Sequence, residues 1–308
     1  MIVGRVREVW RYPVKSMAGE RLEGCGVGGL GLYGDRGWAL RDEEAGEIRG
    51  AKKSPALILC AARYREPPAV GAAPPHADIT LPDGSVTATD APDVNERLSE
   101  LVGRRVTLWP VQAATDRAHY RRAMPFARTI GLLSRSRNFR RLAQGTLRVT
   151  GRDRWLREGF GREPGEPLPD LSALPPALFE FTSTPGTYFD AFPLHLLTTA
   201  SLDALARLNP ESAWDARRFR PNFLIETAPG VEGLVEAGWD GHALRVGALR
   251  LKCEMPAPRC SMTIQAQKEL PKDPRVLRTI VKAGQNLGFY ANVESPAFVS
   301  VGDEVELL

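Results

Sequence analysis

A short turn near the C-terminal end places a cysteine beside an arginine. Residues 256–263 read PAPRCSMT, so two prolines stiffen the approach to Arg259 and Cys260. The neighbouring guanidinium favours the thiolate form of Cys260, which is the form that ligates a metal or attacks an electrophile. A polar, proline-stiffened turn is also a poor place for a core cysteine. From the residues alone two interpretations stay open: Cys260 is functional, or it has no chemical role.

Two more stretches stand out by their polar residues. Residues 11–16 read RYPVKS, where a strand ends in the polar pair Lys15 and Ser16, and residues 217–222 read RRFRPN. The sequence contains no phosphate-binding loop, no nucleophile elbow and no HExxH motif. The glycine-rich run at 26–31 is followed by a turn rather than a helix, which argues against a dinucleotide site.

The composition is that of an ordinary globular protein. Of the 308 residues, 43% are apolar and 25% are charged, which excludes the disordered and fibrous classes. Four cysteines and four histidines are too few and too scattered for a disulfide scaffold, a zinc site or a cysteine-ligated iron–sulfur cluster. No apolar run is long enough to span a membrane, and the charged N-terminus lacks the apolar region of a signal peptide. We therefore expect a cytoplasmic protein.

The positive charge is concentrated in one segment. Between Arg117 and Arg157 the sequence has 12 arginines and one acidic residue, although the net charge of the whole chain is only +4. Such a segment attracts phosphates, acidic proteins, membranes or nucleic acid. The alternative is an ordinary solvated face.

The first 110 residues predict short strands with little helix. The expected strands are residues 2–11, 38–40, 56–64 and 106–109. Residues 56–64 form a nearly continuous apolar run, as in a buried strand, and residues 79–88 predict a hairpin with an Asp-Gly turn. One short helix is expected over 91–102. This pattern favours a small barrel or sandwich.

The rest of the chain mixes helices, linkers and strands. A helix over 129–142 is expected to end at Gly145, and the proline-rich residues 163–169 predict a linker. Two further helices are expected over 199–208 and 276–283. The expected strands are residues 222–226, 243–246, 250–253, 262–265, 289–293 and 304–307.

Taken together, these stretches resemble the MOSC family, named after the C-terminal domain of molybdenum-cofactor sulfurase, and its N-terminal β-barrel companion. The family includes the mitochondrial amidoxime reducing component. The companion domain is similar over residues 11–16, 31–40 and 49–55. The MOSC domain is similar over residues 190–202, 218–225, 239, 258–263, 277–279, 288–293 and 301–307. The stretches occur in the family's order and together span most of the chain.

The resemblance implies a molybdenum cofactor held at the interface of the two halves. In the family the cysteine of the Arg-Cys turn ligates molybdenum, which makes Cys260 the metal ligand and catalytic residue, and a thiolate suits such a soft site. The positions that match the family's cofactor-binding residues are Lys15, Ser16, Arg36, Thr199, Ser201, Arg220, Asn222 and Arg259. Arginine forks suit phosphate, and an asparagine offers a donor and an acceptor. The alternatives are surface ion pairs for the basic residues and a helix cap for Thr199 and Ser201.

The other polar and sulfur residues have weaker claims. Cys253 lies in an apolar run and is expected in the core, and Cys25 and Cys60 are expected to be structural. His195 stands between two leucines, which favours packing over metal ligation. Asp190 begins the MOSC-like part and could act near the metal.

We therefore expect a mixed, β-rich α/β fold with an N-terminal β-barrel-like domain (1–115), a basic insert and linker (116–185) and a MOSC β-barrel domain with short helices (186–308). The expected function is a molybdoenzyme that reduces N-hydroxylated or N-oxygenated substrates. Its electrons would come from a separate protein such as a ferredoxin or flavodoxin, since no ferredoxin-like domain follows Leu308. We expect no nucleic-acid partner.

Two other functions stay open. One is a non-catalytic carrier or sulfuration module for the cofactor, and the other is a sulfur-transfer enzyme that carries a persulfide on Cys260. The sequence leaves undecided the substrate, the electron donor, the nucleotide form of the cofactor, the oligomeric state, and whether residues 117–157 dock a partner or cover the cofactor.

Overall fold

The computed structural model describes residues 1–150 and 153–308; Gly151 and Arg152 of the basic segment lie outside the described residues. The strands are β1 (Ile2–Arg11), β2 (Glu20–Leu22), β3 (Gly24–Gly28), β4 (Gly31–Leu32), β5 (Trp38–Asp42), β6 (Glu47–Arg49), β7 (Ala61–Tyr64), β8 (Ala77–Thr80), β9 (Val86–Ala88), β10 (Val106–Pro110), β11 (Leu194–Thr198), β12 (Phe223–Thr227), β13 (Ala243–Val246), β14 (Leu249–Pro258), β15 (Asn286–Ser295), β16 (Ala297–Ser300) and β17 (Glu304–Leu307). The α-helices are α1 (Val94–Val102), α2 (Arg117–Tyr120), α3 (Ala127–Leu133), α4 (Arg137–Val149), α5 (Arg154–Phe160), α6 (Thr199–Leu208) and α7 (Pro274–Lys282). The 3₁₀ helices are η1 (Pro55–Leu59), η2 (Pro176–Phe179), η3 (Ala216–Arg218), η4 (Val235–Gly238) and η5 (Ser261–Ile264).

Seven strands close into a barrel that joins the two ends of the chain. The strand order is β12-β11-β15-β14-β13-β17-β1, and β1 pairs again with β12. Val3, Val6 and Val9 of β1 point into the barrel core, where each is at most 1% exposed. The register of β1 against β12 shifts between Val6 and Glu8, which explains why the sequence alternation of this strand is imperfect. The first strand thus completes a barrel that is otherwise built from the C-terminal third.

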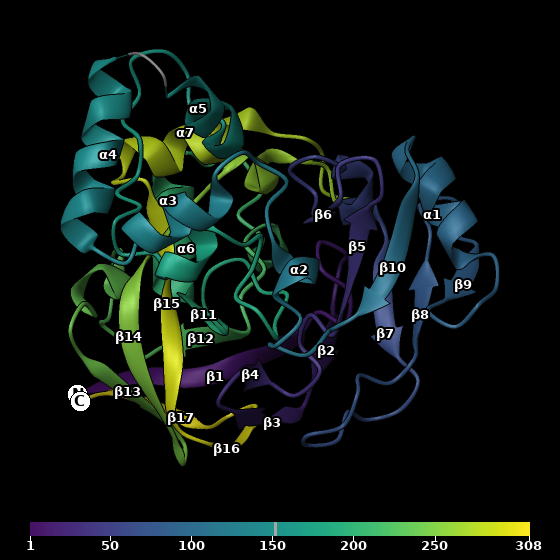
Figure 1. Ribbon diagram of the computed structural model, residues 1–308. Coiled ribbons are helices and arrows are strands. Elements are labelled where there is room, and N and C mark those ends of the chain that lie inside the picture. The colour runs from purple at the N-terminus through teal and green to yellow at the C-terminus, as the bar shows by residue number, and fades with distance from the viewer. Residues whose placement is uncertain (151–152) are drawn as a thin grey trace.

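The N-terminal half forms smaller sheets beside the barrel. One sheet has the order β10-β5-β6 and another the order β7-β8-β9, and α1 packs with them over a second apolar core (Figure 1). The hairpin expected over 79–88 is present as β8 and β9, and the expected helix over 91–102 is α1. The observed fold is therefore the β-rich one that the sequence predicts, with a closed barrel and short helices.

Two strand predictions were wrong. Residues 56–64 are not one strand, because Pro55 starts a 3₁₀ helix and only residues 61–64 are extended. A short apolar run does not distinguish a buried strand from a buried helical turn, and a proline at the first helical position favours the turn. Residues 262–264 belong to η5, and Gln265 is the residue after it, so the strand expected over 262–265 is absent.

The middle of the chain also differs from the prediction. Instead of one helix over 129–142 there are two, α3 and α4, separated at Ser134–Ser136. Gly145 does not end α4 but lies inside it, where no atom would touch an added Cβ. A glycine weakens an exposed helix by only about 1 kcal/mol, so it does not have to terminate one. Helices α3, α4 and α5 lie together with α7 at one end of the barrel, at the top left of Figure 1.

No helix among residues 1–150 and 153–308 combines the length and the apolar composition that a membrane crossing requires.

Candidate functional site

Four segments meet at one end of the barrel. They are the end of β1, the loop before β5, the loop before β12 and the end of β14. The predicted site residues on them are Lys15, Ser16, Arg36, Arg220, Asn222, Arg259 and Cys260. Contacts tie these segments together: Arg220 Nη1 donates to the carbonyl oxygen of Met17 (2.6 Å), and Arg259 Nη2 donates to that of Phe219 (2.8 Å).

Two of the arginines share one aromatic ring. The guanidinium carbon of Arg36 lies 4.7 Å from the ring centroid of Tyr12, and that of Arg220 lies 4.2 Å from the same centroid. The Tyr12 hydroxyl donates to the carbonyl oxygen of Pro221 (3.0 Å). Burial raises the pKa of Tyr12, so the ring stays neutral. Cation–π contacts of this kind hold two like charges close together without an acidic partner for each.

Backbone strain is concentrated at the same residues. Ser16, Arg36 and Arg220 have φ values of +72°, +51° and +56°, in the left-handed region. Non-glycine residues adopt this conformation rarely, at a cost of about 1–3 kcal/mol each, and such residues cluster at functional sites. The Ser16 hydroxyl accepts a hydrogen bond from the amide of Ala51 (2.9 Å), which holds the loop in place.

Lys15 forms a buried ion pair that opens toward solvent on one side. Its Nζ is 2.6 Å from the carbonyl oxygen of Tyr188 and 2.5 Å from Oδ1 of Asp190. Burial lowers the pKa of Lys15, and Asp190 opposes that shift. Against the effect of desolvation, Lys15 holds the pKa of Asp190 well below its usual range, so the pair is ionised at neutral pH. The Asp190 side chain is 70% exposed, whereas that of Lys15 is 10% exposed.

Asn222 has a positioning role in this structure. Its Oδ1 accepts a hydrogen bond from the main-chain amide of His195 (3.1 Å). Its Nδ2 donates hydrogen bonds to the carbonyl oxygen of Trp10 (3.3 Å) and to the carboxylate of Asp35 (3.0 Å). Asp35 also pairs with Arg36. The amide therefore locks β1, β11 and the Arg36 loop together, and no hydrogen of its NH₂ group is left for a ligand.

The Arg-Cys turn has one donor without a partner. Arg259 is 9% exposed, and its Nε makes no hydrogen bond among the described residues. Its Nη1 lies 3.3 Å from Nε2 of His195. Burial, with help from Arg259, holds the pKa of His195 well below its ordinary value, so this ring is neutral. Cys260 is partly exposed, whereas Cys25, Cys60 and Cys253 are buried as expected.

The site carries more positive than negative charge. The cations are Lys15, Lys52, Arg36, Arg220 and Arg259, and the acids beside them are Asp35 and Asp190. Burial lowers the pKa of Arg220 to about 10, which still leaves it protonated at neutral pH. Because partly buried charge is costly without a counter-charge, this excess favours an anionic ligand.

Two residues that the sequence did not identify also reach this end of the barrel. Arg162, which follows α5, donates from Nη2 to the carbonyl oxygen of Arg259 (3.2 Å). Tyr290 of β15 lies 5.5 Å from the ring of His195, and its hydroxyl makes no hydrogen bond among the described residues. Burial raises the pKa of Tyr290 to about 12, so the hydroxyl remains a donor. Arg162 lies in no motif, and its signal is Gly161, whose positive φ ends α5 before it; Tyr290 lies within the MOSC-like residues 288–293 but was not singled out there.

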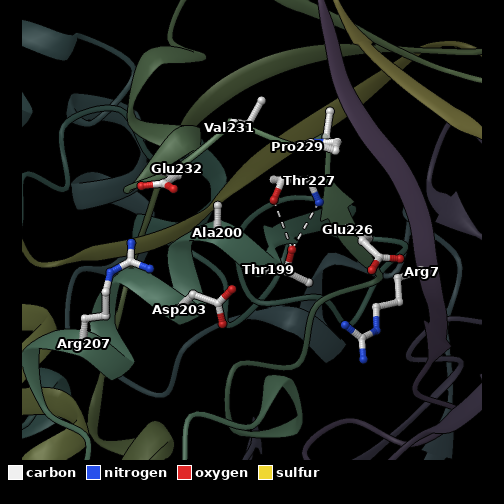
Figure 2. A pocket seen from close by; sticks show the side chains of 12 residues that line it. Arg7, Thr199, Ala200, Asp203, Arg207, Glu226, Thr227, Pro229, Val231 and Glu232 are labelled. Atoms are coloured by element: carbon white, nitrogen blue, oxygen red, sulfur yellow. Dashed lines mark hydrogen bonds between the residues drawn. The ribbon is translucent and has the colours of Figure 1, made fainter.

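Thr199 and Ser201 lie elsewhere. His195 lies near the start of β11, whereas Thr199 and Ser201 follow the other end of that strand, at the start of α6. Thr199 accepts a hydrogen bond from the amide of Thr227 (3.1 Å) and lines a surface pocket of about 350 Å³ (Figure 2). Ser201 is fully buried and bonds Glu236. The structure therefore does not bring these two hydroxyls together with the other predicted residues.

The cap of α6 is formed by a third hydroxyl. Thr198 Oγ1 accepts the amide of Ser201 at 3.2 Å, which is the usual arrangement at a helix N-terminus. Thr199 and Ser201 thus have local structural partners of their own.

Comparison with known proteins identifies both halves. The model of the MOSC N-terminal β-barrel domain matches residues 3–109, and the model of the MOSC domain matches residues 184–306. Mitochondrial amidoxime reducing component 2 of Bos taurus is 23% identical over 98% of this chain and 83% of its own length. The human mitochondrial amidoxime-reducing component 1 is 25% identical over 99% of this chain and 83% of its own length.

Among solved structures, YiiM from Geobacillus stearothermophilus is similar at 17% identity and a TM-score of 0.30, over 38% of this chain and 54% of that one. Both matched domains occur here in the family's order, and together they include every segment that forms the site apart from Arg162. The chain belongs to the MOSC-domain family, with the MOSC N-terminal β-barrel domain at its start and the MOSC domain at its end.

Proposed function

We propose that this end of the barrel binds a molybdenum cofactor and that the protein reduces N-oxygenated compounds. The observation that carries the proposal is the placement of Cys260, the only partly exposed cysteine, beside a cationic cluster with too few acids. The unpartnered Nε of Arg259 and the strained backbone at Arg36 and Arg220 fit a preformed site for an anion. Such a site suits a pterin that carries a phosphate or a nucleotide.

The residues divide into a ligand and a cradle. Cys260 would supply the thiolate to the metal, which is the soft ligand that molybdenum held by dithiolene sulfurs takes. Arg36, Arg220 and Arg259 would hold the phosphate and pterin edges through charge-assisted hydrogen bonds. Lys15 has one of its three donors free and would add to this set, with Ser16 shaping its loop. Asn222 would act through these residues, by fixing their strands, and Thr199 and Ser201 fall outside the proposed set.

A cofactor bound at this site would provide the chemistry that removes an oxygen atom from a nitrogen atom of the substrate. For an amidoxime, the N–O bond breaks, two electrons and two protons enter, and an amidine and water leave. The protein's own polar groups suit such a substrate. The exposed, ionised carboxylate of Asp190 can accept hydrogen bonds from an amidine, and the Tyr290 hydroxyl can donate one to the oxygen that departs.

The electrons would come from a separate protein. Relatives of this chain are named amidoxime reducing components, and the name of a component fits a protein that works together with others. We propose a small acidic carrier such as a ferredoxin or flavodoxin for this chain, acting in the cytoplasm.

One experiment tests the function directly. The protein is produced in a host that makes the cofactor, its molybdenum content is measured, and an aromatic amidoxime is offered with a chemically reduced dye as donor. The expected result is about one molybdenum per chain and formation of the amidine. Protein without molybdenum would contradict the cofactor proposal. Molybdenum without turnover would instead identify a carrier or sulfuration module, and a persulfide on Cys260 without molybdenum would identify a sulfur-transfer enzyme.

A further inference from the structure

The middle of the basic segment carries arginines without partners. Arg128 on α3, Arg135 between the helices, and Arg137 and Arg141 on α4 are all exposed. Their guanidinium groups make no hydrogen bond and no ion pair among the residues that the structure describes. Arg137 instead lowers the pKa of Arg140 after the effect of burial, which shows that like charges lie close together here. Against the effect of burial, hydrogen bonds from Ser172 and the charges of Arg141 and Arg137 lower the pKa of Asp170, so the charge of these arginines is balanced only in part within the described residues.

Arg140 is different from its neighbours. It is 8% exposed and donates to the carbonyl oxygens of Ser172 (2.8 Å), Ser134 and Arg135, so it fastens the start of α4 to the chain around it. The arginines at the ends of the segment are also engaged, for example Arg117 with Glu180. Among the arginines of this segment whose side chains the structure describes, those without a hydrogen bond or ion pair are therefore confined to α3, the turn after it and the first turns of α4.

Large apolar side chains are exposed beside these arginines. Phe126 is 78% exposed, Leu132 59%, Leu133 46% and Leu142 70%. We define the α3–α4 patch by its residues, which are Phe126, Arg128, Leu132, Leu133, Arg135, Arg137, Arg141 and Leu142. Clustered apolar side chains on a soluble protein mark interaction surfaces, and arginine and aromatic residues are enriched in them. In Figure 1, α4 lies at the outer left edge of the molecule.

The patch borders the proposed redox site. Arg137 lines a pocket of about 540 Å³ whose other walls include Met255, Pro256 and Gln285, where β14 ends and the paired strand β15 begins. The carbonyl oxygen of Gln285 accepts a hydrogen bond from the amide of Arg259 (3.1 Å), and Cys260 directly follows Arg259 in the chain. A protein seated on the patch would thus lie over the barrel end that carries Cys260, which electron transfer requires.

We propose that the α3–α4 patch is the docking surface for the electron donor, and that the donor presents an acidic face with an apolar centre. The inference rests on the proposed function for the role of the partner, and on the unpaired arginines for its charge. Each encounter would deliver one electron, and two encounters supply the pair that cleavage of the N–O bond consumes. Charge complementarity of this kind acts mainly on the association rate.

The test uses an acidic plant-type [2Fe–2S] ferredoxin as the probe and measures its binding to the complete protein by surface plasmon resonance. In one variant Arg128, Arg135, Arg137 and Arg141 are all changed to glutamine. Because exposed charges are screened over about 8 Å at physiological ionic strength, wild-type association should slow about tenfold between about 20 mM and about 300 mM NaCl. The variant should be as slow at low salt as the wild type is at high salt.

A second variant matches the loss of four charges elsewhere. Arg7, Arg63, Arg105 and Arg207 are exposed, and their guanidinium groups make no hydrogen bond among the described residues, although Arg63 lies 3.9 Å from Glu20. Changing these four to glutamine should leave association within about twofold of the wild type. Equal slowing by both quadruple variants, or no binding by the wild type at low salt, would overturn the docking proposal. Binding is measured without turnover, so inactivity of the molybdenum-loaded protein with a dye donor would count against the proposed function and not against the patch.

A membrane surface is the competing occupant. Sedimentation with vesicles that contain an anionic lipid distinguishes it: vesicle binding that the patch variant loses, together with no ferredoxin binding, would replace the protein partner by a lipid surface. Changing Leu132 and Leu142 to serine should raise the dissociation rate of ferredoxin, since apolar contacts act after the encounter. No change in that rate would contradict an apolar centre of the interface.

Discussion

Arg162 donates a hydrogen bond from Nη2 to the main-chain oxygen of Arg259, over 3.2 Å. Its two other nitrogens donate to the carbonyl oxygens of Pro167 and Phe160, so each of the three nitrogens has a main-chain acceptor. Arg162 belongs to the segment between the two matched domains, whereas Arg259 stands directly before Cys260. The segment between the two matched domains therefore contacts the site and also carries the α3–α4 patch.

The first prediction concerns the two most different cysteines. Changing Cys260 to serine should abolish reductase activity, because an alkoxide is a much poorer ligand than a thiolate for a soft metal site. Changing Cys253 to serine should retain activity. Cys253 is 3% exposed in the barrel core and burial raises its pKa to about 12, so it is an inert thiol. Its hydroxyl replacement should cost about 1–3 kcal/mol of unfolding free energy. Equal activity of Cys260→Ser and wild type, at equal molybdenum content, would refute the ligand assignment.

The second prediction concerns the arginines that would hold the cofactor. Arg220→Ala should reduce the molybdenum content of the purified protein, since a charge-assisted hydrogen bond contributes about 1.5–3 kcal/mol, or about ten- to a hundredfold in affinity. Arg141→Ala is the matched control, because Arg141 is exposed and unpaired. Arg140 would be a poor control, since its burial and its bonds to carbonyl oxygens make any truncation there destabilising. Equal loss of metal in the Arg220 and Arg141 variants would show that Arg220 does not anchor the cofactor.

The sequence predicted the elements whose pattern is local. The helix over 199–208 has the observed bounds, and the strands over 2–11 and 304–307 were found because their apolar residues and turn signals are clear. What the pattern did not show is that β1 closes the barrel against β12 and β17, because such pairing depends on contacts between the two ends of the chain. Termini that meet in one sheet leave no trace in local periodicity.

The same distinction applies to the site. Lys15, Arg36, Arg220 and Cys260 were identifiable because each lies in a motif, and the structure places them together. Arg162 was not, because its role depends on where α5 ends relative to a distant turn. The proposed strand over 262–265 failed for a related reason: Thr263 satisfies the carbonyl oxygen of Cys260 through both its amide and its hydroxyl, which is a local turn that apolar spacing does not reveal.

The third prediction is a pH dependence of stability. The pKa of His195 is well below 6.5 in the folded protein because of burial and the nearby Arg259, whereas the unfolded chain has an ordinary histidine. The unfolded state therefore binds a proton as the pH falls below about 6.5, and the folded state does not until the pH is much lower. The contribution of His195 to stability is fully present above that pH and is lost as the pH falls.

Urea denaturation of the metal-free protein, compared between about pH 7.5 and about pH 5.5, measures this loss. His195→Gln should be less stable than wild type at the higher pH but should lose less on acidification, since glutamine does not titrate. His242→Gln is the control, because the His242 side chain is exposed and its Nδ1 lies 3.2 Å from the carbonyl oxygen of Leu308. An acid-induced loss that is the same in wild type and His195→Gln would show that the His195 ring is not the titrating group.

The last prediction tests the three hydrogen bonds that the Arg162 side chain donates to main-chain carbonyl oxygens, one of them that of Arg259. Arg162→Met removes three donors and leaves buried carbonyl oxygens without partners, at about 1–3 kcal/mol of unfolding free energy for each group that water cannot reach. The Arg259–Cys260 turn should then be less well ordered, and the purified protein should retain less molybdenum. Arg162→Lys should recover part of both properties, because an ammonium can satisfy one carbonyl oxygen but cannot reproduce the planar fork.

Arg154→Met provides the comparison for Arg162. Arg154 is on the same helix, α5, but its side chain is 89% exposed and its one partner, Glu158, is 63% exposed. Surface pairs of this kind contribute little, so this variant should change the unfolding free energy by no more than about 0.5 kcal/mol and should keep its metal. Urea denaturation and metal analysis of the three variants separate the outcomes. If Arg162→Met matched Arg154→Met in both measurements, the hydrogen bond to Arg259 would be incidental, and the segment between the domains would act only through its exposed patch.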